Sequence, residues 1–251
     1  MPRLALPRSL HALVRAVVDF ALPPRCPGCG VVVAADHSFC LACWQSLDFL
    51  RGPACAVCAA PLELALYDDA RCGACLADPP PFDRLRAAVA YGLIARALAL
   101  KLKYGRRPGI AATMAGPLRR AAGDMLADAL VVPVPLHRCR LWWRGYNQSA
   151  LIARAVTPSG DLALDLLVRR RATAALRGMG PSARARTVAG AFALNPVWAA
   201  RVRGARVVLV DDVYTTGATV RACARVLRAA GAAEITVLCW ARVVRDGDPA
   251  R

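Results

Sequence analysis

Four Cys-x-x-Cys pairs constrain the fold of this 251-residue chain more tightly than any other feature. Each pair can form a turn that presents two thiolates to one ion, and two such turns complete a tetrahedral four-sulfur site. Ten residues separate the first two pairs and thirteen separate the last two, so we predict two structural zinc ions, each bound by neighbouring turns. The predicted ligands are Cys26, Cys29, Cys40, Cys43, Cys55, Cys58, Cys72 and Cys75.

The cysteine pattern leaves several alternatives open. Disulfides compete with zinc as an interpretation, but no signal peptide favours an oxidising compartment. Crossed pairing of the turns, and a ligand role for His37 beside Cys40, also remain open. A closed four-cysteine site has no open coordination position, so we expect no catalysis by this zinc. The isolated Cys139, Cys223 and Cys239 are expected to be small packing residues.

The residues before the first pair predict a short amphipathic helix. Arg15 and Asp19 interrupt the apolar stretch and argue against a signal peptide. Apolar residues recur at helical spacing from Leu10 to Ala21, with Ser9 as the N-cap. We expect this helix to pack on the body of the protein, with a membrane-surface helix as the alternative. No apolar run is long enough to span a membrane, and we expect a cytoplasmic protein.

Strands and helices alternate after a proline-rich junction at residues 78–82. Hydrophobic patterns predict strands at 84–91, 129–135, 207–212 and 235–241. They predict helices at 93–102, 110–126, 147–156 and 217–230. This alternation predicts an α/β domain with a parallel sheet covered by helices on both faces. The predicted domains are the helix at 1–22, a double zinc ribbon at 23–78 and the sheet domain at 82–245.

The segment VVLVDDVYTTGATV, residues 207–220, predicts a ligand site. Ligands bind beyond the carboxyl ends of strands in open parallel sheets, where we expect Asp211 and Asp212. The following Thr-Thr-Gly turn opens a helix whose N–H groups and hydroxyls can wrap a phosphate, and Gly217 allows close approach. Two carboxylates beside a phosphate cradle suit the vicinal hydroxyls of a sugar. The predicted ligand is therefore a ribose 5-phosphate.

The same segment resembles the phosphoribosyl diphosphate (PRPP) binding motif of type I phosphoribosyltransferases. It is preceded in order by the four cysteine pairs and by FDRLRAAVAY, LKLKYGRR, VVPVPLHRCRLWWRGYNQSALIAR and RRRATAALRGMGPSARARTVAGAF. This succession resembles the ComF family of competence-associated proteins, which join a double zinc ribbon to a phosphoribosyltransferase domain. The resemblance covers nearly the whole chain from Cys26 to Arg242. It implies PRPP binding with Mg²⁺ and a link to DNA uptake in natural competence.

The resemblance also implies roles for individual residues. Asp211 and Asp212 would bind the ribose hydroxyls, and Lys103, in the family's Leu-Lys-Tyr element with Tyr104, would join them as a catalytic group. The loop at 133–137 would face the diphosphate, supported by Arg140 and the segment 144–148. The residues expected to contact PRPP besides the two aspartates are Thr215, Thr216, Gly217, Thr219, Pro135, His137 and Arg144.

Residues 171–192 would form a hood over the site, where the chain departs from the family pattern. Leu176 replaces the usual glutamine and Thr187 the usual asparagine, so both changes remove an amide. The sequence therefore leaves open whether the chain transfers the phosphoribosyl group to an unidentified acceptor or binds PRPP as an effector. In a transfer reaction, Mg²⁺ and basic loops would stabilise the leaving diphosphate. No nucleophile is identifiable, and His137 is interpretable as an acid–base group or as a structural residue.

The net charge of +17 suits a phosphate-rich partner. All but two of the 34 basic residues are arginine, which a genome-wide composition bias also produces. The exceptions, Lys101 and Lys103, share one short segment and suggest a need for compact ammonium groups, with ordinary surface lysines as the alternative.

Aromatic residues among arginines support a second functional hypothesis. Trp142, Trp143 and Tyr146 lie close in sequence to Arg138 and Arg140. Bases can stack on such aromatic rings while cations follow the phosphates. The alternative function is thus a non-catalytic accessory protein that binds single-stranded DNA through its arginine-rich surface and zinc ribbons, in contact with the DNA-uptake machinery. The competing interpretation places both tryptophans in the core.

Overall fold

The computed structural model describes residues 23–65, 67–157, 160–172 and 181–244. The predicted helix at 1–22 and Leu176 lie outside the described residues. Within the described part, no helix is both long and apolar enough to cross a membrane.

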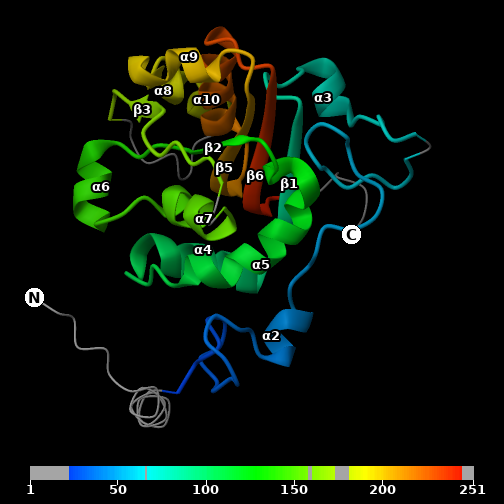
Figure 1. The fold of residues 1–251 in the computed structure, drawn as a ribbon. Coiled ribbons are helices and arrows are strands. Elements are labelled where there is room, and N and C mark those ends of the chain that lie inside the picture. Colours follow the sequence, from blue (N-terminus) through cyan, green and yellow to red (C-terminus); the bar gives the residue numbers. More distant parts are fainter. Residues whose placement is uncertain (1–22, 66, 158–159, 173–180, 245–251) are drawn as a thin grey trace, which may run out of the picture.

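A four-stranded parallel sheet forms the centre of the molecule (Figure 1). The strands lie in the order β1 (Arg84–Ala90), β6 (Glu234–Arg242), β5 (Arg206–Tyr214) and β2 (Leu130–Pro133). The predicted parallel sheet is confirmed by the register of all three strand pairs. Strand β5 runs two residues further than predicted, because Val213 and Tyr214 pair with Ala241 and Arg242 of β6.

Three helices cover one face of this sheet: α4 (Leu93–Tyr104), α5 (Ile110–Ala122) and α7 (Gln148–Val156). Val208 and Val210 of β5 point into this layer, as alternate residues of a strand must. Helix α5 contains Pro117 and is shorter than predicted, since its last turn becomes the 3₁₀ helix η1 (Gly123–Leu126).

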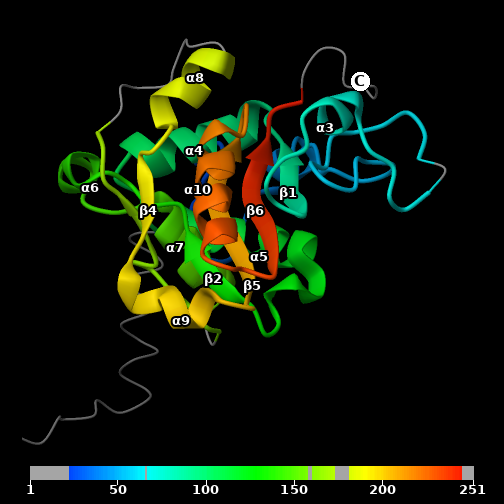
Figure 2. The same cartoon turned by 90° about the horizontal axis from the view of Figure 1, so that it is seen from above.

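The opposite face is covered by α10 (Ala218–Ala229) and by a small antiparallel pair, β3 (Leu167–Arg169) and β4 (Phe192–Leu194). Figure 2 shows α10 in front of the sheet when the molecule is viewed from this side. The short elements α6 (Arg138–Arg144), α8 (Pro181–Val188), η2 (Pro196–Trp198) and α9 (Ala199–Val202) complete the domain. Together, α10 and the three helices across the sheet confirm that helices cover both faces.

The two cysteine-rich ribbons, residues 26–43 and 55–75, lie at separate places on the sheet domain (Figure 1). The first ribbon contains α2 (Leu41–Gln45) and is joined to α4 by Lys101, whose Nζ donates to the carbonyls of Pro27 at 2.5 Å and Gly28 at 3.0 Å. The second contains α3 (Gly73–Ala77) and lies beside β1, where the Leu85 N–H donates to the Val57 carbonyl at 2.7 Å. Lys101 is therefore no ordinary surface lysine.

Candidate functional site

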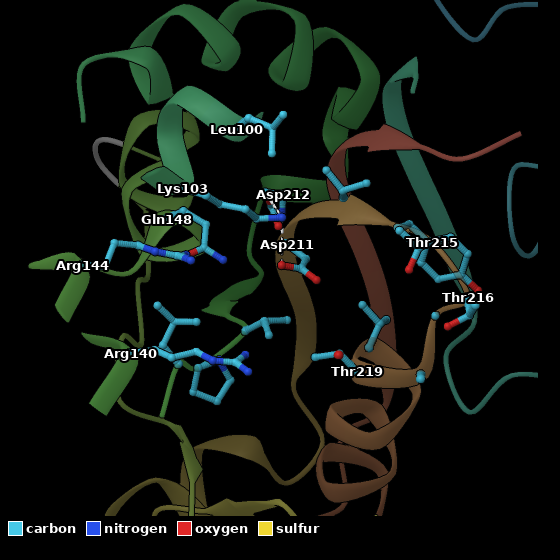
Figure 3. Close-up of a pocket in the computed structure, with 18 of the residues that line it drawn as sticks. Leu100, Lys103, Arg140, Arg144, Gln148, Asp211, Asp212, Thr215, Thr216 and Thr219 are labelled. Carbon is cyan, nitrogen blue, oxygen red and sulfur yellow. Dashed lines mark hydrogen bonds and ion pairs between the residues drawn. The ribbon is translucent and has the colours of Figure 1, made fainter. Parts of the chain in front are cut away.

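A pocket of about 610 Å³ opens beyond the carboxyl ends of β2 and β5 (Figure 3). It lies where an open parallel sheet is expected to bind ligands. Of the residues predicted to bind or act on PRPP, all but His137 line it. Those that do are Lys103, Pro135, Arg144, Asp211, Asp212, Thr215, Thr216, Gly217 and Thr219.

Asp211 and Asp212 are buried, with exposed fractions of 8% and 3%. Oδ1 of Asp211 accepts hydrogen bonds from the Ser149 hydroxyl at 3.0 Å and from the Asp212 N–H at 2.9 Å. Oδ2 of Asp212 lies 2.5 Å from Nζ of Lys103. Figure 3 shows the Lys103 side chain pointing toward Asp212. The two carboxylates therefore have different partners, one neutral and one cationic, although both reach the same pocket.

The electrostatics of this cluster follow from burial and mutual repulsion. Burial, and then the charge of Asp212, raise the pKa of Asp211 to about 7, although Lys103 and the hydrogen bonds from the Asp212 N–H and Ser149 oppose the rise. Burial by itself would lower the pKa of Lys103, but the attraction of Asp212 outweighs it and leaves that pKa raised. Lys103 is therefore charged at neutral pH, while Asp211 is near its midpoint.

The turn between β5 and α10 forms the opposite end of the pocket, with Thr215, Thr216 and Thr219 at its edge (Figure 3). Gly217 caps α10 with a φ of 74°, a left-handed conformation that favours glycine. A Cβ at this position would lie 2.4 Å from the Tyr214 hydroxyl, so space also requires glycine. The Thr216 hydroxyl is buried and has no hydrogen-bond partner within the described part of the chain. A phosphate at this helix N-terminus would supply the missing partner.

Arginines form the wall that faces this turn. Arg140 and Arg144 reach the pocket from α6 (Figure 3), and Arg169 reaches it from β3. Arg144 donates to the Gln148 side chain at 2.5 Å, and burial lowers the pKa of both Arg144 and Arg169. Guanidinium groups in a half-buried pocket are suited to the oxygens of a diphosphate. Arg169 is not among the residues predicted from the sequence, although the run of three arginines at 169–171 is a signal that could have indicated it.

His137 has a structural position. It is buried, it lies outside the lining of the pocket, and its Nδ1 accepts from the Cys139 N–H at 3.3 Å as the N-cap of α6. This geometry favours the structural interpretation of His137. In the hood, the Thr187 hydroxyl donates to the Ala183 carbonyl of its own helix at 2.8 Å.

The tryptophans of α6 do not pack in the core. Trp142 is 87% exposed and Trp143 is 62% exposed. Trp143 also lines the pocket. The core-packing interpretation is thus wrong for both, because α6 has no buried residue and lies on the surface.

Two groups of four cysteines have the geometry of metal sites. The ligand atoms lie within 4.8 Å of one another in the groups Cys26, Cys29, Cys40, Cys43 and Cys55, Cys58, Cys72, Cys75. One sulfur–sulfur distance in each group is 3.6 Å, close to the roughly 3.8 Å edge of a tetrahedron with zinc–sulfur bonds of about 2.3 Å. Sequential pairing is thereby confirmed over crossed pairing, and His37 belongs to neither group.

The three isolated cysteines differ from one another. Cys223 and Cys239 are fully buried, as expected of packing residues. Cys139 is exposed, so the packing prediction is wrong there; its helix lies on the surface.

Known proteins resemble this chain over most of its length. Residues 17–76 match the family described as "Double zinc ribbon domain", and residues 160–249 match "Phosphoribosyl transferase domain". The chain is 35% identical to "DNA utilization protein YhgH" of Salmonella typhimurium, over 89% of this chain and 99% of the relative. It is 31% identical to "Competence protein F" of Haemophilus influenzae, over 87% of this chain and 96% of the relative.

A solved structure titled "Structure of the allosteric regulatory enzyme of purine biosynthesis" aligns with 56% of this chain and 30% of its own, at 25% identity and a TM-score of 0.33.

Proposed function

The chain belongs to the ComF family of competence-associated proteins, and from this premise we propose that it binds PRPP with Mg²⁺ in the pocket beyond β5. One observation carries the proposal: a single pocket combines two buried carboxylates with a Thr/Gly turn at a helix N-terminus. Carboxylates suit ribose hydroxyls and the turn suits a phosphate, so the pocket matches both parts of a ribose 5-phosphate. In this proposal, residues 23–78 form the double zinc ribbon and residues 82–245 the phosphoribosyltransferase-like domain.

Each wall of the pocket has a part in the proposed complex. Asp211 and Asp212 accept hydrogen bonds from the ribose hydroxyls, and the ion pair with Lys103 holds Asp212 in place. The backbone of the turn and the Thr216 hydroxyl hold the 5-phosphate. Arg140, Arg144 and the residues after β2, including Pro135, face the diphosphate.

The donor set also fits Mg²⁺. Carboxylate and phosphate oxygens are the ligands this ion prefers, and Asp211 and Asp212 bring carboxylates to the pocket where the diphosphate would lie. When bound, the ion neutralises charge on the diphosphate. If an acceptor attacks the anomeric carbon, the arginine wall stabilises the charge that develops on the departing diphosphate.

Calorimetric titration with PRPP tests the proposal. We expect binding in the presence of Mg²⁺ and its loss in the paired substitutions Asp211→Asn and Asp212→Asn. Because both side chains are buried, Thr216→Val is a second test that leaves the carboxylate cluster intact. Asp165→Asn is the matched control, since Asp165 accepts from Asn195 and Trp198 outside the pocket lining. Equal affinity in all variants would place PRPP elsewhere.

The exposed tryptophans of α6 favour a second function, the binding of single-stranded DNA. Trp142 and Trp143 are available for base stacking, and Arg138 and Arg140 lie on the same helix. The names of the two relatives refer to DNA utilization and competence. Because Trp143 also lines the pocket, PRPP and DNA should compete.

Fluorescence anisotropy with a labelled oligonucleotide tests this second function. Binding should weaken steeply with salt. Trp142→Ala should weaken it about tenfold, the loss expected for one stacked base. Trp198→Ala is the matched control, because Trp198 lies under Arg201 in another part of the domain. No binding at low salt, or an equal effect of both substitutions, would argue against the DNA site.

A further inference from the structure

The second four-cysteine cluster is in direct contact with the end of β6. Arg242, the last residue of this strand, is 7% exposed. Its Nε donates to the Cys58 carbonyl at 2.9 Å, and its Nη2 lies 3.7 Å from the Cys58 sulfur. Another of its nitrogens donates to the carbonyl of Val243 at 3.3 Å. The turn that contains Cys58, a predicted zinc ligand, thus supplies a main hydrogen-bond acceptor for the buried guanidinium of Arg242.

Arg242 pairs in register with Tyr214, the last residue of β5. The Val243 N–H donates to the Tyr214 carbonyl at 2.9 Å, which fixes the two strand ends to each other. The Tyr214 ring is 8% exposed and packs edge-on against Phe82, with ring centroids 6.3 Å apart. Burial raises the pKa of Tyr214.

Tyr214 also supports the phosphate-binding turn. Its hydroxyl lies 2.4 Å from the position that a Cβ on residue 217 would occupy, and Cε2 and Cζ lie 2.7 Å from it. The ring therefore underlies Gly217 with no space between them. A continuous set of contacts runs from Cys58 through Arg242 and Tyr214 to the turn.

The first cluster is attached differently. Its turn accepts two hydrogen bonds from Lys101 on α4, and Cys29 is exposed. The first ribbon packs on the α4 face of the sheet, where Leu47 shares a core with Leu98 and Trp44 packs against that core. The turn of the second cluster packs on the opposite face, where Ala59 belongs to the same core as Tyr214. The two clusters are therefore attached to different faces of the sheet, and the second is attached on the face that contains Tyr214.

We propose that the second four-cysteine cluster, and not the first, holds the phosphate-binding turn in its binding conformation, with Arg242 and Tyr214 as positioning residues. Loss of the metal would free the turn at residues 55–58 and remove an acceptor from the buried Arg242. A buried charge that loses a main acceptor is costly, so the guanidinium shifts and displaces the end of β6. Tyr214 then loses its fixed position under Gly217. The inference deepens the proposed function and rests on it for its ligand readout.

Paired cysteine substitutions test the asymmetry. Cys58→Ser and Cys29→Ser should each lower the zinc content from two equivalents to about one. In Cys58→Ser, amide exchange at residues 215–219 should accelerate about tenfold and affinity for ribose 5-phosphate should fall about tenfold, as for loss of one hydrogen bond to a charged group. In Cys29→Ser, the exchange rate at residues 215–219 and the affinity for ribose 5-phosphate should both stay at the wild-type value. Equal effects of the two substitutions would overturn the proposal.

Arg242→Gln tests the connection with both metal sites intact. Zinc content should stay at two equivalents while exchange at residues 215–219 accelerates, and Arg242→Lys should restore part of the protection because an ammonium can still donate to the Cys58 carbonyl. Arg228→Gln is the matched control, since Arg228 bonds Asp83 and the carbonyls of Ala232 and Ala233 instead. Unchanged exchange in Arg242→Gln would refute the proposal even if Cys58→Ser fails to fold. If the wild type does not bind PRPP in the calorimetric titration, the proposed function fails, and the exchange measurements still decide the positioning role.

Discussion

Removing the ammonium of Lys103 should destabilise the fold by more than a surface ion pair is worth. Nζ lies 2.5 Å from Oδ2 of Asp212, and the two side chains are 25% and 4% exposed. Exposed ion pairs contribute about 0–1 kcal/mol, whereas breaking a buried pair by removing one partner costs about 3–5 kcal/mol. Because Lys103 keeps some contact with solvent, we expect Lys103→Met to lower the free energy of unfolding by about 3 kcal/mol, toward the low end of the buried range.

Urea unfolding at pH 7.5, followed by circular dichroism, measures this cost. The double variant Lys103→Met with Asp212→Asn should recover most of the lost stability, because the unpaired charge is then gone. Lys103→Arg should cost less stability than Lys103→Met, because it keeps the charge. It should still be less stable than the double variant, since a planar guanidinium is longer than the ammonium it replaces at this short contact. A cost below about 1 kcal/mol, the value of an exposed pair, would refute the reasoning. So would a double variant no more stable than Lys103→Met.

Three further predictions concern the turn, pH and metal. Gly217→Ala should destabilise the protein by about 2–4 kcal/mol in thermal unfolding, through left-handed strain and overlap with Tyr214, and a loss below about 1 kcal/mol would contradict the close contact. The pKa of Asp211 in the folded protein is raised to about 7, so the folded state binds this proton more tightly than the unfolded state. The free energy of unfolding should therefore fall as pH rises from about 4 to 7. PRPP affinity should increase from pH 6 to 8, as Asp211 loses its proton. Asp211→Asn should flatten both profiles, and profiles unchanged by it would assign the titration to another group. Metal analysis should find about two zinc equivalents per chain, and disulfides in a folded, metal-free protein would defeat this expectation.

The sequence predicts the sheet and the turn after β5 well because both depend on local patterns. Apolar runs mark β1, β2, β5 and β6, and the Thr-Thr-Gly turn follows its strand directly. The regular spacing of the cysteines likewise allows the two four-cysteine groups to be predicted. These features need no knowledge of distant contacts.

The remaining features depend on tertiary contacts that local patterns do not encode. Strands β3 and β4 have three residues each, too few for an alternation to be visible. Arg169 of β3 lines the same pocket as Arg140 of α6, and the contact between Arg242 and Cys58 joins residues 184 positions apart. The surface position of α6, which exposes Trp142, also depends on packing and not on its composition.

Phosphorus NMR of PRPP in the presence of the protein and Mg²⁺ tests whether the pocket binds both ends of the ligand, because it observes the 5-phosphate and the diphosphate separately. The wild type should perturb the resonances of both groups. Thr216→Val should reduce the effect on the 5-phosphate, while Arg144→Gln should reduce the effect on the diphosphate. PRPP resonances unchanged by the wild-type protein, or perturbed equally by all variants, would contradict the account.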